Sequence, residues 1–563
     1  METPLASRRE RRKTHKQGRI TIIVLLLFAL LGFIFLYIRP CFQQQPLNTG
    51  QTRIYYMGEL VEFLPYYRGE QLYLPFIFVK EYVDPDIKWD EFNKQLIVTN
   101  NKEVYHIIPQ KSQGLCNLES FSLEKPLLLR DDIVYIPREM LEILYNIEIL
   151  EQKVDNIVSI VNLEEPMQLG RVTDISKLRT HPKTRSAWVY EVQPSEQVRI
   201  LKEKSGWFWI ETKDGRLGYM PKGKLTLIDI NKAIPAIKSG FQPWKPLGEP
   251  IFSTWEYVYN KTADPAKIGD LAGVNVLAPT WFYLEEEGNV LSKADKEYSN
   301  WYHQQGKQVW AVFSNDCEID LTHSFLADSN KRRKVIEQLL EYADMYDLDG
   351  YGIDFEYMYM EDKEEYVQFI RELVPIMHNN GLAINVYIIF HSTSERWSLC
   401  YDHQALAESA DYLTVMAYDQ HTALAGSSAS MPWVEKGIIR MLEDVPSQRL
   451  VLGIPFYTRL WKEEPGDDGK IVTTKQTFSM EQMEVWLEEQ KPQIDIDDEA
   501  GQHYIEIRQG KILYRMWLED EYSLEKRIEL VKKYRLAGTA AWRRGLEKDE
   551  VWSTLSKLLN KRW

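Results

Sequence analysis

The pattern of hydrophobic and polar positions changes near residue 250. Before it, short runs alternate apolar and polar side chains, the period expected of strands with one buried face. After it, short apolar runs alternate with segments of helical spacing, such as Lys331 to Asp347. The pattern predicts β-rich domains first and an alternating strand–helix domain last.

Eight apolar runs in the last part of the chain are predicted to be strands. Eight strand–helix units over roughly 300 residues favour a (β/α)8 TIM barrel over an open doubly wound sheet. The stretch from Arg459 to Asp520 is too long for a connection, and alternation in "YIEIRQGKILYRMW" predicts a small α+β insertion after strand seven. The predicted strands are Ile251 to Tyr259, Val274 to Pro279, Gln308 to Ser314, Gly350 to Glu356, Leu382 to Ile388, Tyr412 to Tyr418, Leu450 to Phe456 and Gly538 to Trp542.

Residues 52–163 contain a weak internal repeat. "YLPFIFVKEY…IKWDEFNKQLIV" recurs as "YIPREMLEIL…IEILEQKVDNIVSIV", with Leu74-Pro75 and Ile136-Pro137 in corresponding places. Each copy predicts a proline-marked entry, a short helix and an alternating strand. The repeat resembles the small N-terminal domain of copper amine oxidases, which many bacterial wall proteins reuse. The resemblance implies a spacer or wall-contact module that holds no metal.

Residues 170–228 read as short strands joined by turns. Alternation around Trp207 and Trp209 and a turn at Asp214-Gly215 predict a small all-β barrel. The run "GWFWIETKDGRLGYMP" resembles the bacterial SH3-like domain, a module that commonly binds cell-wall peptides. A purely structural β barrel is an equal alternative.

The N-terminus carries the longest uncharged run. Ile20 to Ile38 is 19 residues without a charge, enough to cross a bilayer core of about 30 Å. Residues 1–19 contain seven basic and two acidic side chains. The positive-inside rule therefore predicts a cytoplasmic segment over 1–19, a single-pass anchor in the cell membrane over 20–38, and an extracytoplasmic remainder. A cleaved signal peptide is the alternative, but no small-x-small cleavage site follows.

Charge and cysteine content exclude several classes of protein. The net charge is −15, and the chain therefore makes a poor partner for nucleic acid. The four cysteines lie far apart without a C-x-x-C pair, so they form neither a metal pattern nor a disulfide framework. With 563 residues, the chain is expected to fold as two to four domains.

Candidate chemistry lies in "LDGYGIDFEYM", residues 348–358, on predicted strand four. A period of two places Gly352, Asp354 and Glu356 on one face and three apolar side chains on the other. Because the apolar face must pack under helices, both acids should point into the barrel, with Glu356 at the C-terminal rim that carries barrel chemistry. Structural ion pairs are the alternative, but few Arg or Lys residues occupy inward strand positions.

Two acids on one face suggest an unusual glycosidase. Ordinary glycosidases place their carboxylates on opposite sides of the bond, whereas residues i and i+2 of a strand, roughly 6.5–7 Å apart, approach from one side. A 2-acetamido sugar can supply the missing nucleophile itself. Glu356 would then protonate the leaving oxygen, and Asp354 would hold the acetamide N–H and stabilise the oxazolinium intermediate. This chemistry requires no cofactor or metal.

The same segment resembles a family signature. "DGYGIDFE" is similar to the D-x-x-D-x-D-x-E motif of glycoside hydrolase family 18, bacterial wall and spore-germination members included. Asp349, Asp354 and Glu356 match the motif, whereas Gly352 does not carry the middle acid. That departure leaves open how Asp354 is tuned, since its usual lower partner is missing.

Two further segments extend the resemblance over the barrel. "VMAYDQH" resembles the family's M-x-Y-D and implies that Met416 and Tyr418 line the pocket, with Tyr418 bonding the acetamide oxygen and Asp419 in support. "GTAAWRRG" resembles the family segment whose tryptophan lies beneath the sugar on the non-reducing side of the cleaved bond, which implies this role for Trp542.

The sequence thus predicts a membrane-anchored glycosidase with a catalytic barrel over 250–563. The expected reaction cleaves β-1,4 bonds at N-acetylglucosamine in peptidoglycan, with chitin as another possible polymer. The alternative is an inactive family 18 protein that binds carbohydrate or tethers the cell wall.

Overall fold

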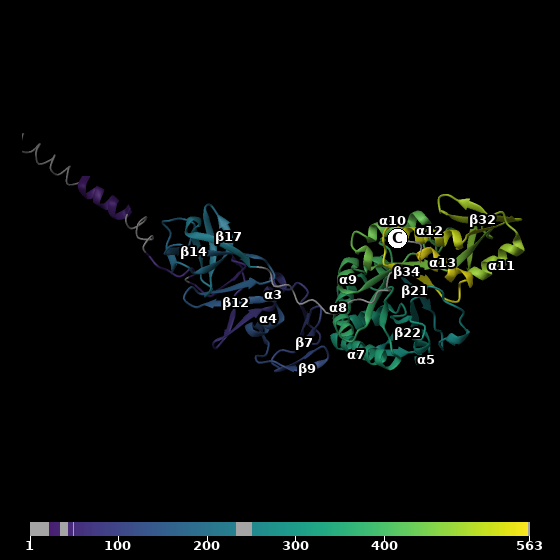
Figure 1. Ribbon diagram of the computed structural model, residues 1–563, viewed down its shortest axis with the longest axis horizontal. Coiled ribbons are helices and arrows are strands. Elements are labelled where there is room, and N and C mark those ends of the chain that lie inside the picture. Colours follow the sequence, from purple (N-terminus) through teal and green to yellow (C-terminus); the bar gives the residue numbers. More distant parts are fainter. Residues whose placement is uncertain (1–21, 34–42, 49, 232–249, 561–563) are drawn as a thin grey trace, which may run out of the picture. The chain divides into compact units, whose positions relative to one another are not determined.

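The computed structural model of the protein describes residues 22–33, 43–48, 50–231 and 250–560 (Figure 1). These residues belong to two compact units. The first comprises residues within 1–88, 107–114 and 120–238, and the second those within 89–106, 115–119 and 239–563.

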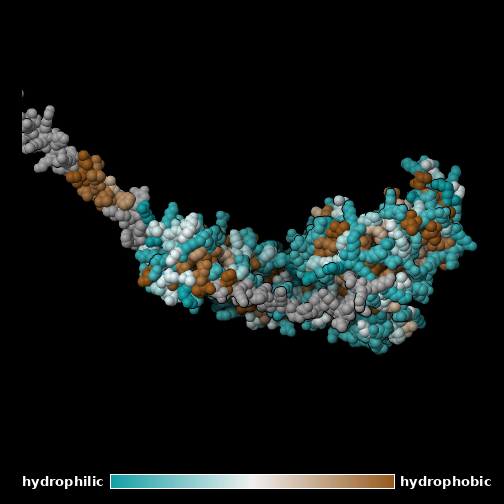
Figure 2. Space-filling model, turned by 45° about the horizontal axis from the view of Figure 1, so that its top comes forward, coloured by the Kyte–Doolittle hydropathy of each residue, from teal (hydrophilic) through white to brown (hydrophobic). Residues whose placement is uncertain are grey.

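The predicted transmembrane anchor is a wrong prediction. No helix among the described residues is both long and apolar enough to cross a bilayer, so the single-pass topology and the placement of the barrel outside the cell membrane lose their basis. The described helical residues of this segment are 22–33, brown in Figure 2. The rest of the predicted segments, 1–21 and 34–38, lies outside the described residues.

The internal repeat of the first unit is visible as two matching strand–helix pairs. Strand β4 (Gln71–Pro75) leads into α3 (Phe76–Tyr82), and β11 (Ile133–Pro137) leads into α4 (Arg138–Leu144). The proline that ends each strand caps its helix in extended conformation, as expected of a residue that cannot donate a backbone hydrogen bond. The two strands pair antiparallel, with Leu74 opposite Ile136.

Three sheets make up most of the first unit. They have the strand orders β12-β13-β1-β2, β10-β11-β4-β3 and β16-β15-β19-β18-β17-β14-β20. The third is all-β and encloses its own apolar cluster around Ile210 and Leu178. Its likeness to an SH3 domain stays a prediction. The further strands are β1 (Arg53–Tyr56), β2 (Glu59–Leu60), β3 (Tyr66–Arg68), β10 (Leu128–Arg130), β12 (Ile147–Gln152), β13 (Ile157–Asn162), β14 (Met167–Val172), β15 (Ser176–Arg179), β16 (Trp188–Val192), β17 (Gln197–Lys204), β18 (Trp207–Thr212), β19 (Leu217–Pro221) and β20 (Leu225–Asn231).

The second unit contains the predicted TIM barrel. Eight parallel strands follow the order β21-β34-β28-β27-β26-β25-β24-β22, and pairing of β21 with β22 closes the ring. The strands are β21 (Ile251–Glu256), β22 (Val276–Glu285), β24 (Gln308–Ser314), β25 (Gly350–Asp354), β26 (Ala383–Ile388), β27 (Tyr412–Met416), β28 (Leu450–Pro455) and β34 (Gly538–Trp542). The surrounding helices are α5 (Lys296–His303), α6 (Ile319–Leu326), α7 (Ser329–Tyr346), α8 (Lys363–Asn379), α9 (His403–Ser409), α10 (Met431–Met441), α12 (Glu521–Lys533) and α13 (Glu550–Asn560).

Aromatic side chains fill the barrel lumen. Trp310 and Tyr412 stack with their ring centroids 5.7 Å apart, and Trp255 packs against Tyr387 at 4.9 Å. All four are almost fully buried in one cluster inside the ring. The barrel is therefore packed from within, and open space begins at its C-terminal rim.

A small α+β insertion separates β28 from α12, where the sequence predicted one. Its sheet has the order β30-β29-β33-β32-β31, with α11 (Met480–Gln490) beside β30. The strands are β29 (Tyr457–Pro465), β30 (Ile471–Ser479), β31 (Asp495–Asp497), β32 (Gln502–Gln509) and β33 (Ile512–Trp517). Because β29 begins two residues after β28 ends, the insertion starts at the barrel rim.

The second unit also includes a segment from outside the barrel sequence. Strands β5 (Lys88–Asp90), β6 (Gln95–Thr99) and β7 (Val104–Ile107) belong to a five-stranded sheet with β8 (Gln113–Cys116) and β9 (Glu119–Ser122). Asn93 donates a hydrogen bond to Asp328, the N-cap of α7, at 2.8 Å. Residues 89–106 thus dock on the start of α7.

A buried ion pair joins α7 to α8. Arg332 and Glu372 are 1% and 0% exposed, and Nη2 lies 2.8 Å from Oε1. Burial alone would raise the pKa of Glu372, but the guanidinium outweighs it and holds that pKa below its usual range. Such a pair is costly to break because the remaining charge has no water to solvate it.

We expect Glu372→Gln to lower the free energy of unfolding by about 3–5 kcal/mol, since buried Arg332 then keeps only the partly exposed Glu365, 3.4 Å away, as an ion-pair partner. Glu529→Gln is the control, because the Lys526–Glu529 pair is exposed and should contribute about 1 kcal/mol or less. Chemical denaturation of both variants measures the difference. An equal loss of unfolding free energy in the two variants would show that the buried pair contributes no more to stability than the exposed pair.

Candidate functional site

The two acids of β25 stand at the C-terminal end of the barrel. The strand ends at Asp354, and Glu356 follows two residues later. The intervening positions Tyr351, Ile353 and Phe355 are fully buried in the core cluster that the helices share. Strand alternation therefore turns both acids inward, as the sequence predicted.

Asn315, which follows β24, holds the backbone beneath the second acid. Its Oδ1 accepts a hydrogen bond from the Glu356 N–H at 3.0 Å, and its Nδ2 donates to the Glu356 carbonyl at 2.8 Å. Thr322 on α6 accepts a second bond from the same Nδ2 at 2.8 Å. From the other side, Tyr401 donates to the carbonyl of Phe355 at 2.7 Å. The position of Glu356 is thus fixed by neighbouring elements.

Burial dominates the electrostatics of both acids. Burial and then the charge of Asp419 raise the pKa of Glu356 to about 7. Burial and then the charge of Glu356 raise the pKa of Asp354 well above its usual range. Two neighbouring carboxyl groups with little water resist joint ionisation. Glu356 is therefore protonated up to about neutral pH and can donate that proton.

A third carboxylate, Asp419, is occupied by partners. Arg459 Nη2 lies 2.5 Å from Asp419 Oδ1, and the Tyr457 hydroxyl donates to the same oxygen. Arg459 also donates to the carbonyl of His421 at 2.9 Å. This ion pair fixes Asp419 in one orientation, while its charge still acts on Glu356.

A pocket of about 420 Å³ unites these side chains. All six predicted catalytic and substrate-binding residues line it: Asp354, Glu356, Met416, Tyr418, Asp419 and Trp542. The other lining residues are Tyr457, Arg459, Thr477, Arg543 and Leu546. They come from β25, the ends of β27 and β34, and the insertion. The volume suits a single sugar ring with its substituents.

Three polar side-chain atoms of the residues that line the pocket are buried without a hydrogen-bond partner among the described residues. They are Oδ1 of Asp354, the hydroxyl of Tyr418 and Nε of Arg459. Buried polar groups are normally satisfied, so unpartnered atoms in one pocket indicate that a ligand completes them. The Asp354 oxygen can accept a hydrogen bond, and the Tyr418 hydroxyl can donate one.

The other two motif residues lie away from the pocket. Asp349 precedes β25 at the opposite end of the strand, where Oδ2 accepts from the Val309 N–H at 2.8 Å and contacts His303 Nε2 at 2.7 Å. Its place suggests support of the barrel floor. Gly352 lies one strand repeat below Asp354, against Tyr387 of β26.

Sequence reasoning missed Tyr457, Arg459 and Asn315. One signal was available: Tyr457 and Arg459 alternate directly after the predicted seventh strand, which places both at the rim. Asn315 gave no such signal, because its role is a pair of backbone hydrogen bonds to a distant strand.

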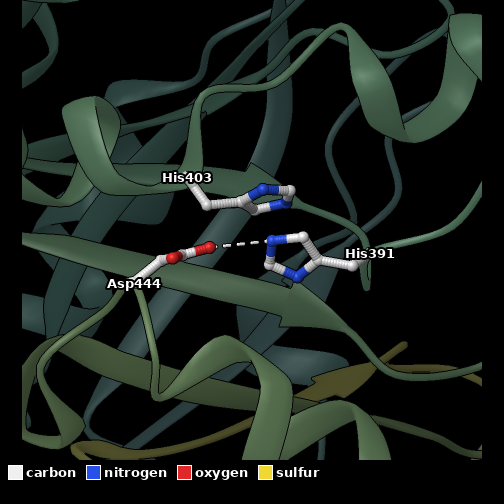
Figure 3. Close-up of side chains that lie close together, drawn as sticks. All are labelled: His391, His403 and Asp444. Carbon is white, nitrogen blue, oxygen red and sulfur yellow. Dashed lines mark hydrogen bonds and ion pairs between the residues drawn. The ribbon is translucent and has the colours of Figure 1, made fainter.

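Figure 3 shows a cluster outside the pocket, in which His391, His403 and Asp444 bring potential metal-binding atoms within 4.8 Å of one another. His391 Nε2 lies 2.9 Å from Asp444, and His403 Nε2 lies 3.1 Å from the carbonyl of Ile389. The two imidazole rings lie one over the other, with centroids 4.1 Å apart. The ring planes are tilted by 35°, and Nε2 of each histidine is already engaged by Asp444 or by the Ile389 carbonyl, so the cluster fits a hydrogen-bonded support better than a metal centre.

Comparison with known families agrees with this geometry. Residues 305–547 match the model of glycosyl hydrolases family 18, and residues 56–160 match the copper amine oxidase N-terminal domain. Both are families that the sequence resembles.

Individual relatives fall in the same family. The chain is 24% identical over 298 residues to the uncharacterized glycosylase YvbX of Bacillus subtilis, covering 50% of this chain and 84% of that protein. It is 26% identical over 247 residues to the cortical fragment-lytic enzyme of B. subtilis, covering 43% of this chain and 57% of that enzyme. The chain thus spans little more than half the length of the second relative.

Solved structures share the fold. The Chromobacterium violaceum chitinase superposes with a TM-score of 0.50 at 21% identity, covering 56% of this chain and all of that one. The Bacillus cereus spore cortex-lytic enzyme SleL gives a TM-score of 0.50 at 17% identity, covering 60% and 78%. The family match over residues 305–547 shows a glycosyl hydrolase family 18 domain in this part of the chain and makes the protein a glycosidase, and the solved structures share the fold of its barrel.

Proposed function

We propose that the barrel cleaves β-1,4 bonds at N-acetylglucosamine in peptidoglycan, by substrate-assisted catalysis with retention of configuration. The observation that carries this proposal is the pairing of two acids on one side of the pocket with two of its unpartnered polar atoms, Asp354 Oδ1 and the Tyr418 hydroxyl. An acetamide group offers the complementary N–H donor and carbonyl acceptor.

Glu356 is the proposed general acid. Its pKa of about 7 keeps it protonated near neutral pH, where it can deliver a proton to the leaving glycosidic oxygen. As the bond breaks, the acetamide oxygen of the same sugar attacks the anomeric carbon and forms a cyclic oxazolinium ion. Glu356, now ionised, then takes a proton from the water that opens the ring. Two displacements at one carbon retain its configuration.

Asp354 and Tyr418 are proposed to hold the acetamide. The N–H would donate to Asp354 Oδ1, and the Tyr418 hydroxyl would donate to the carbonyl oxygen. The positive charge of the oxazolinium ion then lies beside the Asp354 carboxylate, which stabilises it most in a buried site. Met416 and Trp542 would supply apolar contact beneath the ring.

The third carboxylate argues for a nucleophile from the substrate. Asp419 is bonded to Arg459 and Tyr457, which stabilise it as a fixed anion and reduce its reactivity. Its charge serves instead to raise the pKa of Glu356. The acetamide of the substrate is therefore the proposed nucleophile.

The polymer is argued from the relatives. Those named cortical fragment-lytic enzyme and spore cortex-lytic enzyme favour peptidoglycan, while the chitinases favour chitin, and both polymers present N-acetylglucosamine. The modules expected over 52–163 and 170–228 would serve as a spacer or a wall contact. An inactive carbohydrate-binding protein is the competing function, and the presence of both acids speaks against it.

We expect Glu356→Gln to lower kcat by about 10²- to 10⁴-fold, because the substitution removes the proton donor and leaves the shape of the pocket. Mass spectrometry of peptidoglycan and chitin oligomers treated with the full chain would identify products that end in N-acetylglucosamine. Glu463→Gln, which removes a carboxylate paired with Arg515 outside the pocket, is the matched control and should keep full activity. Equal activity of the Glu356 variant and the wild type would exclude the assignment of the acid.

Activity should fall as pH rises through about 7, since Glu356 loses its proton there. Asp419→Asn removes the charge that helps to raise the pKa of Glu356 and should move this midpoint to lower pH. The pH dependence of kcat measures the shift, with Glu463→Gln as the control that leaves the midpoint in place. A midpoint that does not move would mean that Asp419 does not tune the acid.

A further inference from the structure

The site lacks the middle acid of the family motif, and another residue fills its place. A Cβ built on Gly352 would lie 2.4 Å from the hydroxyl oxygen of Tyr387 and 2.6 Å from the ring carbon that bears it. No side chain fits in that space beside Tyr387. The Tyr387 side chain therefore accounts for the glycine at position 352.

Tyr387 is held rigidly in this position. It lies on β26, which pairs parallel with β25 and places Asn385 opposite Gly352. Its ring is 2% exposed and packs against Trp255, with centroids 4.9 Å apart. The side chains of Asn385 and Trp255 also hydrogen-bond the hydroxyl, so the oxygen has little freedom to move.

The hydroxyl lies on the same side of the barrel as Asp354. Gly352 and Asp354 are alternate residues of one strand, so a group at the position of the missing side chain lies directly below the carboxylate. Burial and then the charge of Asp354 raise the pKa of Tyr387, which therefore remains a neutral donor. Asp354 Oδ1 has no partner among the described residues in the orientation observed.

We propose that Tyr387 is a positioning residue that replaces the missing acid: its hydroxyl donates a hydrogen bond to the Asp354 carboxylate from the side of the barrel floor. Asp354 is then held between the acetamide above it and the phenol below it. A phenol can donate but brings no negative charge. It stabilises ionised Asp354 without competing for its proton, which a second carboxyl group would do.

The surroundings of Asp354 offer few other ways to stabilise its charge. Glu356 raises its pKa by repulsion, and several nearby titratable groups are neutral hydroxyls or a thiol. The groups whose pKa responds to Asp354 are Tyr283 on β22, Cys317 after β24, Tyr366 on α8, Tyr387 on β26, Tyr401 before α9 and Tyr418 after β27. Tyr387 is the one among them that occupies the motif position beneath the carboxylate.

The first test uses Tyr387→Phe, which removes one oxygen and keeps the ring on Trp255. This test rests on the proposed function. We expect kcat to fall about ten- to a hundredfold, the range of a hydrogen bond to a charged group, with little change in KM. Tyr351→Phe is the matched control. Tyr351 lies on the outer face of β25, and its hydroxyl donates to the Leu339 carbonyl at 2.5 Å, so the substitution removes a buried hydroxyl outside the pocket. A wild-type kcat in the Tyr387 variant would overturn the proposal.

The second test needs no activity. The Tyr387 hydroxyl is proposed to stabilise ionised Asp354, so removing it raises the pKa of Asp354 further. The loss of thermal stability in Tyr387→Phe should therefore be largest at pH values above the pKa of Asp354, where the carboxylate is charged. The loss should shrink as pH falls through that pKa. Tyr351→Phe should lose the same amount at every pH. In an Asp354→Asn background, Tyr387→Phe should also become independent of pH. A loss that does not depend on pH in the wild-type background would overturn the inference, whether or not the proposed glycosidase reaction is observed.

Discussion

The site depends on the burial of two carboxyl groups side by side at the mouth of a barrel. Strand β25 sends its apolar side chains into the helical layer, and alternation then forces Asp354 and Glu356 inward. The aromatic lumen beneath them excludes water. Desolvation raises the pKa of both groups, and repulsion adds to it, from Glu356 on Asp354 and from Asp419 on Glu356. An acid that keeps its proton near neutral pH follows from this placement.

The surrounding residues act on that constraint in different ways. Asn315 fixes the backbone of Glu356, while Arg459 and Tyr457 hold Asp419 as a stationary charge. Tyr387 occupies the space that Gly352 leaves. These contacts fix the positions of the charged groups, so the pocket is preorganised before a sugar binds.

The sequence allowed prediction of the features that depend on local periodicity. The eight barrel strands and the inward face of β25, with Asp354 and Glu356, follow from short patterns. Met416, Tyr418, Asp419 and Trp542, which also line the pocket, were indicated by the resemblance to glycoside hydrolase family 18. Asn315 and Tyr387 could not be predicted, because their importance lies in contacts between separate strands. The prediction of a membrane anchor over 20–38 is contradicted, because no helix among the described residues is long and apolar enough to cross a bilayer.

The most direct measurement compares two oligosaccharides that differ in one group. One carries an N-acetyl group on the sugar that enters the pocket, and the other carries a free amine there. If the acetamide is the nucleophile, the full chain will cleave the acetylated oligomer and leave the amine unchanged at equal concentration. Comparable cleavage of both would contradict substrate assistance and require a nucleophile from the protein.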